Sequence, residues 1–161
     1  MDVASISAAV AAISVVVGVI FAIFQMRNAA RTRHTGLIIQ LNPALRVTMS
    51  ELIEYISKIW NLEFKDYEEY QEKYGDPLSD KALHTITGYN DGLGYLLYKQ
   101  LIDIETIEYI LSGSSTVVWE KLKPIIEGMR KQYNMPKLFE WFEYLYKEIQ
   151  RREQRLQQTQ Q

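Results

Sequence analysis

Four Glu-x-x-Glu pairs are the residues of this sequence whose type and spacing could hold a metal or move a proton. They are Glu51/Glu54, Glu69/Glu72, Glu105/Glu108 and Glu140/Glu143. Helical bundles hold paired iron with inward-facing glutamates that include two Glu-x-x-His pairs. Here Arg31 precedes His34 by three residues and Lys81 precedes His84 by three, so neither histidine has that partner. The pattern therefore favours solvated helix faces, and we expect no metal, no cofactor and no catalytic residue.

Other catalytic patterns are missing from the sequence. The chain has no cysteine, which excludes thiolate zinc sites and cysteine nucleophiles. The glycines of Gly88-Tyr-Asn-Asp-Gly92-Leu-Gly94 do not have the spacing of a dinucleotide loop, and a close helix–helix approach or a helix irregularity is favoured for them. His84 is expected to be partly buried and hydrogen-bonded. An enzyme with an unfamiliar site stays open as an alternative, with Glu51, Glu105 and Glu140 as its candidate carboxylates.

Residues 3–24 form an uncharged run that contains twelve Val, Ile or Phe residues. As a helix this run would rise about 33 Å, enough to cross the about 30 Å hydrocarbon core of a bilayer. Its strongly apolar side chains contribute roughly −5 kcal/mol to insertion. A cleaved signal peptide would need a basic start and a shorter apolar stretch, whereas this chain starts with Met1-Asp2. The run therefore predicts a retained transmembrane anchor.

Basic residues follow this run and do not precede it, beginning with Arg27, Arg31 and Arg33. Because arginine and lysine concentrate on the cytoplasmic side of a span, we expect a single-pass protein of the cell (plasma) membrane with its N-terminus outside and its C-terminal domain in the cytoplasm. The three arginines are expected to contact lipid headgroups. Small residues recur along one face of the run, as in helix–helix interfaces within lipid, although chance is an open alternative in a run so rich in Ala and Ser. The residues of this predicted span interface are Ser7, Ala11, Ser14, Gly18 and Ala22.

The apolar pattern of the remaining chain is helical almost throughout. We therefore predict an all-α protein in which an N-terminal transmembrane helix precedes a small helical-bundle cytoplasmic domain. Its predicted parts are the anchor and basic juxtamembrane segment at 1–34, the helical domain at 35–149 and a Gln-rich tail at 150–161. Helices are expected near 45–60, 66–74, 79–101, 104–111, 116–133 and 136–156, with an interruption at Asn42-Pro43 and a kink or break at Pro124.

Charge is uneven along the chain, although its net value is only −2 and a basic surface for nucleic acid is not expected. Residues 51–108 carry five basic and thirteen acidic groups, whereas residues 109–161 carry nine basic and six acidic. The acidic middle either faces a basic partner or lies over the basic C-terminal helix of the same domain, which is the favoured interpretation. In that last helix Trp141 lies off the apolar seam, and an exposed Trp141 would be the best candidate for a partner contact.

Several segments carry a resemblance to a known family. They are Arg31-Thr32-Arg33-His34-Thr35 with Ile39 and Leu41-Asn42, Trp119-Glu120-Lys121 with Lys123-Pro124-Ile125-Ile126 and Arg130, and Phe139-Glu140 with Tyr144-Leu145. With these segments the chain resembles a family of uncharacterised prokaryotic membrane-anchored proteins that have a small all-helical cytoplasmic domain, a domain of unknown function. The resemblance implies this topology and fold class, and it implies no activity.

Together these features predict a membrane-anchored helical interaction module, or a small accessory subunit of a membrane protein assembly, without enzyme activity. The expected partners are the lipid bilayer and either a second copy of the chain, in a homo-oligomer, or other membrane proteins. The alternative is a signalling or stress-response component whose cytoplasmic helical domain binds a small ligand between its helices.

Overall fold

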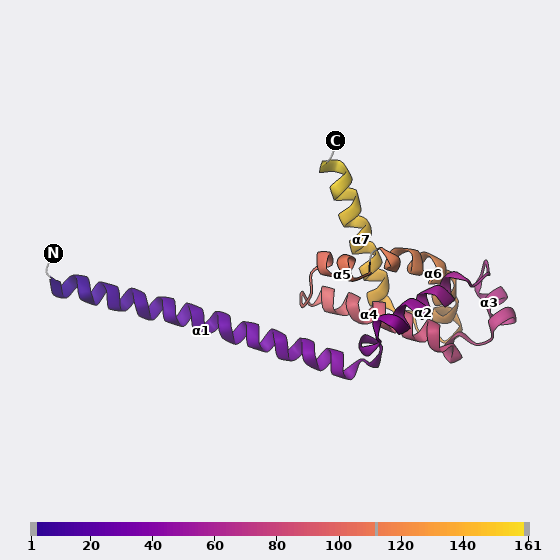
Figure 1. The fold of residues 1–161 in the computed structure, drawn as a ribbon, viewed down its shortest axis with the longest axis horizontal. Coiled ribbons are helices and arrows are strands. Elements are labelled where there is room, and N and C mark those ends of the chain that lie inside the picture. The colour runs from indigo at the N-terminus through magenta and orange to yellow at the C-terminus, as the bar shows by residue number, and fades with distance from the viewer. Residues whose placement is uncertain (1–2, 112, 160–161) are drawn as a thin grey trace. The chain divides into compact units, whose positions relative to one another are not determined.

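The computed structural model describes residues 3–111 and 113–159, and their side chains from residue 17 onward. The chain divides into two units, Met1–Ile38 and Ile39–Gln161. All the regular elements in the described residues are helices, which confirms the predicted all-α class (Figure 1).

The first unit consists of most of α1, a single helix over Val3–Leu41. Among the described residues no helix is both long and apolar enough to cross a membrane, so the transmembrane helix predicted at residues 3–24 is not shown. Residues 3–16 of that predicted span lie outside the described side chains.

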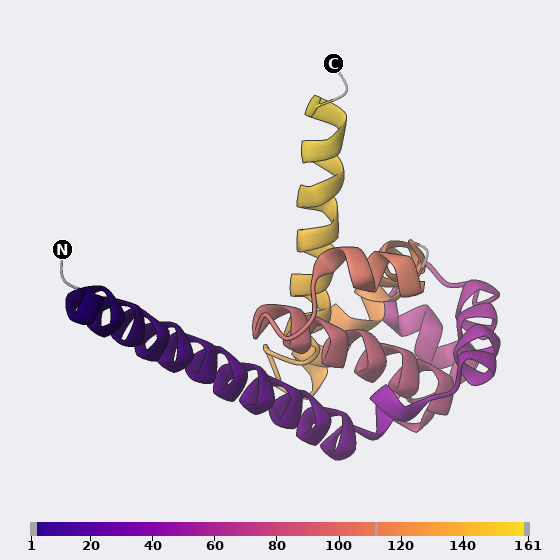
Figure 2. The same cartoon turned by 60° about the vertical axis from the view of Figure 1, so that its left-hand side comes forward.

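The second unit contains six α-helices and two short 3₁₀ helices among its described residues. They are η1 (Pro43–Arg46), α2 (Met49–Trp60), α3 (Tyr67–Tyr74), η2 (Pro77–Ser79), α4 (Lys81–Tyr98), α5 (Ile104–Leu111), α6 (Ser114–Gln132) and α7 (Glu140–Thr159). Helix α4 is central, because it packs against η1, α2, η2 and, most extensively, α7. The C-terminal half of α7 extends past the other helices of this unit in both views (Figures 1 and 2).

Short-range side-chain caps determine where several of these helices begin. Thr48 and Glu51 form a reciprocal capping box at the start of α2. Asp80 accepts from the backbone N–H groups of the first turn of α4, and Asp66 does the same at α3. The interruption predicted at Asn42-Pro43 is confirmed, since α1 ends at Leu41 and the Asn42 side chain caps η1.

The core lies among α2, α4, α6 and α7. Its fully buried side chains include Ile59, Ile86, Leu122, Ile125, Ile126, Met129, Phe142 and Leu145. Helix α6 is continuous through Pro124, so no break occurs there. Helix α7 starts at Glu140, four residues later than predicted, because Asn134 and Phe139 adopt positive φ angles of 52° and 54° in the preceding turn.

Candidate functional site

The residues predicted to act at the membrane lie on α1. The side chains of Ser7, Ala11 and Ser14 are outside the described residues, and Gly18 and Ala22 are exposed. The predicted headgroup contacts Arg27, Arg31 and Arg33 are also exposed. Nothing in the described part of the chain tests a span interface or a headgroup contact, so both sets remain predictions.

Trp141, the predicted partner contact, is half-buried in an aromatic cluster of the second unit. Its ring centre lies 4.4 Å from that of Tyr98 and 5.6 Å from that of Tyr95, both on α4. Tyr144, one turn further along α7, has its ring centre 6.3 Å away. The indole therefore contributes to the packing of α7 on α4, and its remaining exposed surface is what a partner would contact.

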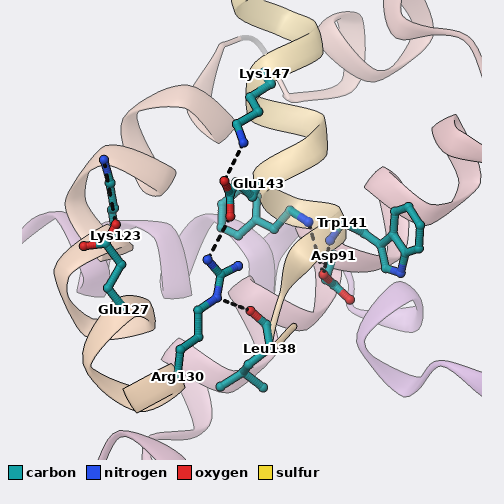
Figure 3. Close-up of polar contacts among 9 residues, drawn as sticks. Asp91, Lys123, Glu127, Arg130, Leu138, Trp141, Glu143 and Lys147 are labelled. Atoms are coloured by element: carbon teal, nitrogen blue, oxygen red, sulfur yellow. Dashed lines mark hydrogen bonds and ion pairs between the residues drawn. The ribbon is translucent and has the colours of Figure 1, made fainter. Parts of the chain in front are cut away.

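The side chain of Asp91, on α4, caps the N-terminal end of α7 and so connects the same two helices. Its Oδ1 accepts from the backbone N–H groups of Trp141 and Phe142 at 3.0 and 3.1 Å, at the start of α7 (Figure 3). Burial raises the pKa of this carboxyl, although the two N–H groups oppose the shift. Sequence reasoning did not identify Asp91, because its partners lie fifty residues along the chain.

Arg130 of α6 holds the turn before α7 and the first turn of that helix together. Its Nε donates to the carbonyl of Leu138 at 2.9 Å, and its Nη1 lies 2.8 Å from Glu143 (Figure 3). Lys147 also pairs with Glu143, at 2.6 Å. The hydrogen bond from Lys147, followed by that from Arg130, holds the pKa of Glu143 below its usual value. Asp91 and Arg130 thus fix the N-terminal end of α7 from two sides.

The close approach predicted for the glycine segment of α4 is confirmed. A Cβ at Gly94 would lie 2.5 Å from the carbonyl carbon of Trp141, so the α7 backbone passes directly over this residue. On another part of α4, a Cβ at Gly92 would lie 2.7 Å from Nδ2 of Asn42, and one at Gly88 would lie 3.1 Å from Cβ of Ala44. The segment is therefore a packing motif.

An apolar groove of about 450 Å³ lies between α2, α5 and the start of α6. Its lining includes Met49, Ile53, Ile56, Trp60, Ile110 and Leu111. Ile53 is 62% exposed and Trp60 is 52% exposed, although both side chains are large and apolar. Large apolar side chains gathered in this way on one surface are typical of a binding site for another protein.

A second, more polar cleft of about 360 Å³ lies between η1, α2 and α4. Lys81, His84 and Thr85 line its α4 wall, and Glu51 and Tyr55 line its α2 wall. Its remaining lining is largely apolar and comes from η1 and its flanks, through Pro43, Ala44 and Val47. His84 is exposed here, which corrects the expectation that this side chain is partly buried.

The three carboxylates named for an unfamiliar enzyme site lie on separate helices and have different roles. Glu51 belongs to the capping box of α2, and Glu140 is the first residue of α7. Arg152 of α7 binds Glu105 at 3.1 Å and also Glu108, which places this part of the acidic middle against the basic C-terminal helix. Among the residues that the structure describes, no three His, Asp or Glu side chains form a group that could hold a metal ion.

The fold and these surfaces define a small all-helical domain that follows one long N-terminal helix and whose surface includes an apolar groove and a more polar cleft. The chain belongs to the family described as a domain of unknown function, DUF4760, whose model matches residues 12–149. This confirms the predicted membership of an uncharacterised family. Comparison with curated proteins and with solved structures gives no match.

Proposed function

We propose that this protein is a membrane-anchored interaction module, or a small accessory subunit of a membrane protein assembly, whose α2–α5 groove binds a basic amphipathic helix of a partner membrane protein. The apolar groove is the observation that carries the proposal. The anchor places the N-terminus outside the plasma membrane and the helical domain in the cytoplasm. The family resemblance, which implies a prokaryotic protein of this topology, agrees with that placement.

The anchor is supported by the composition of residues 3–24 and by their basic flank. A span needs about 20 predominantly apolar residues, and this run has no charged side chain. Arg27, Arg31 and Arg33 follow it on the side that the positive-inside rule assigns to the cytoplasm. Within lipid, the stripe from Ser7 to Ala22 would allow the anchor to approach another span closely.

The spacing of the apolar residues with which α2 lines the groove suits a helical occupant. Met49, Ile53, Ile56 and Trp60 follow one another at intervals of four, three and four residues, which is the seam pattern of packed helices. A partner helix that carries apolar side chains at the same intervals could pack along this seam and against Ile110 of α5. Burial of a large apolar side chain contributes about 1.5–3 kcal/mol, so a few such residues would suffice for specific binding.

The charge of the two helices that line the groove favours a basic occupant. Residues 103–111 carry three acidic groups and no basic one, and Arg152 compensates two of them. On α2, Lys58 pairs with Asp80 at 3.2 Å and not with Glu54, which stays exposed. Among the described residues neither Asp103, whose Oδ1 accepts from the backbone N–H of Thr106, nor Glu54 forms an ion pair. Their negative charges can therefore attract lysine or arginine on the flanks of a partner helix.

Site-specific photo-crosslinking of the full chain in native membranes tests this proposal. A photoreactive residue at Ile53 should capture a partner, and the crosslinked peptide should contain apolar residues at three- and four-residue intervals flanked by Lys or Arg. The matched control is Leu78, which is 48% exposed on η2 and outside the groove. With the photoreactive residue moved to Trp60, Ile53→Asp should abolish capture, whereas Leu78→Asp should leave it unchanged.

Two outcomes would contradict the proposal. If the probe at Ile53 captured only second copies of this chain, the groove would be a homo-oligomer interface. If the probes at Ile53 and Leu78 captured the same proteins in equal amounts, the groove would have no specific occupant. Ile53 is largely exposed, so Ile53→Asp should leave the thermal stability nearly unchanged, which separates lost binding from unfolding.

A further inference from the structure

We infer that the cleft between η1, α2 and α4 binds a small zwitterion, with its anionic phosphate at Lys81 and its ammonium at Glu51. Ligand binding between the helices of the domain is the alternative function named in the sequence analysis, and this cleft is where we place it. The inference does not depend on the partner helix proposed for the α2–α5 groove. The cleft uses Glu51 and Tyr55 of α2, whereas the groove uses Met49, Ile53 and Ile56 on another side of the same helix.

The α4 wall of the cleft offers hydrogen-bond donors to an anion. Lys81 and His84 are three residues apart on α4 and both line the cleft, as does Thr85. The Lys81 ammonium lies 5.9 Å from the centre of the Tyr55 ring on the opposite wall. A hydrogen bond with Tyr55, together with the charge of Glu51, raises the pKa of Lys81, so the side chain is cationic at physiological pH.

The α2 wall offers a fixed anionic acceptor. The Oε2 atom of Glu51 accepts from the backbone N–H of Thr48 at 3.0 Å and from its hydroxyl at 2.7 Å. These two hydrogen bonds lower the pKa of Glu51 and hold its carboxylate in one orientation. The second oxygen, Oε1, takes part in neither bond and can accept from a ligand ammonium.

Opposite charges on facing walls select a ligand that carries both charges itself. An anion alone would be repelled by Glu51, and a cation alone would be repelled by Lys81. Between these ends, Pro43, Ala44 and Val47 provide an apolar surface suited to a short methylene stem. The cleft volume of about 360 Å³ falls within the range of roughly 300–1,000 Å³ that is typical of small-molecule sites.

Two sources can supply this chemistry, namely a free phosphoethanolamine-like compound and the ethanolamine headgroup of a membrane lipid. The chain has only two histidines, so the imidazole NMR signals of the histidine-labelled full chain report on His84 in the cleft and on His34 outside it. His34→Gln assigns the two signals. One arm adds O-phosphoethanolamine to protein in phosphatidylcholine nanodiscs, and the other replaces part of that lipid with phosphatidylethanolamine.

We expect a saturable shift of the His84 signal in at least one arm, and the arm that responds identifies the source. Lys81→Met and Glu51→Gln should each weaken binding at least tenfold, and Gln at position 51 can keep the capping box, so α2 remains intact. The matched controls are Lys123→Met and Glu127→Gln, which alter an ion pair on α6 (Figure 3) and should not change binding.

Other outcomes would overturn the inference. If neither arm shifted the His84 signal, the cleft would not bind this class of ligand. If ethanolamine alone or inorganic phosphate alone gave the same shift at the same concentration as O-phosphoethanolamine, recognition would not need both charges. Binding that survived both Lys81→Met and Glu51→Gln would assign the ligand to a different site.

Discussion

Gly94→Ala should destabilise the helical domain, because no space exists for a methyl group between α4 and α7. A Cβ at this position would lie 2.5 Å from the Trp141 carbonyl carbon and closer still to its oxygen. These are backbone atoms, so the clash is relieved only if the start of α7 moves by about 1 Å or more. Such overpacking costs about 1–3 kcal/mol.

Two further contributions modify this value. A shift of α7 would lengthen the hydrogen bonds from Trp141 and Phe142 to Asp91, and loss of a helix cap costs about 1 kcal/mol. In the opposite direction, alanine has a higher helix propensity than glycine, which stabilises the helix by about 1 kcal/mol. The free energy of unfolding should therefore fall by about 1–3 kcal/mol.

The other glycines of α4 supply graded controls. Gly92→Ala would meet side-chain atoms of Asn42 and Leu45, which can rotate away, so its loss should be smaller. Gly88→Ala, at 3.1 Å from Cβ of Ala44, should be close to neutral. Gly36→Ala on α1 has no atom within 4 Å of its Cβ and should not destabilise the domain.

Urea unfolding of the full chain in mild detergent, followed by tryptophan fluorescence, measures this series. The expected order of destabilisation is Gly94→Ala, then Gly92→Ala, then Gly88→Ala. A Gly94→Ala protein as stable as the wild type would refute the close approach of α7. We assign the tightest contact of α4 to Gly94, which meets α7, and not to Gly88, which meets η1. A larger loss of stability for Gly88→Ala than for Gly94→Ala would refute this assignment.

Two further predictions concern the α7 cap and the anchor. Asp91→Ala should cost about 1–2 kcal/mol of stability, because two N–H groups lose their acceptor, whereas Asp91→Asn keeps an acceptor and should cost less. Burial raises the pKa of Asp91 above 3.8, so the folded protein holds this proton more tightly than the unfolded chain, and its contribution to stability declines as the pH rises through the raised pKa. Asp91→Asn should lack that decline when urea unfolding is followed as the pH rises from below the ordinary aspartate pKa, and an unchanged pH dependence would contradict the assignment. Because the chain has no cysteine, an impermeant thiol reagent applied to intact cells should label Asp2→Cys directly but Glu127→Cys only after permeabilisation, and the reverse pattern would contradict the proposed orientation.

Local signals in the sequence predicted most helix boundaries. Asp66 caps the helix that was expected from residue 66, and α5 covers Ile104–Leu111 as expected. Helix α4 instead begins at Lys81, two residues later than predicted, because Asp80 caps it. Ion pairs with short-range partners were also predictable, since Lys73 and Lys147 each bind the glutamate four residues earlier. These features depend only on residues within one or two helical turns of each other.

Features that depend on distant residues were not predictable in this way. Lys58 binds Asp80 and not Glu54, and Arg152 binds Glu105 and Glu108 and not Glu148, because tertiary packing brings these partners closer. The apolar side chains of α2 do not all face the core, since Ile53 is mostly exposed while Ile59 is fully buried. Helical periodicity identifies an apolar face, but the elements that cover it are set by the whole fold.

In the glycine segment of α4, the spacing of the glycines along the sequence corresponds to contacts with elements that are distant in the chain. At about 100° per residue, Gly88 and Gly92 lie on nearly the same face of the helix, whereas Gly94 lies about 200° beyond Gly92. The first two glycines meet η1 and its flank, and the third meets the backbone of α7. The spacing of four and two residues therefore encodes two close approaches on opposite faces of one helix. A phosphate-binding loop would instead need its glycines in a turn that precedes a helix, which explains why this segment has no such role.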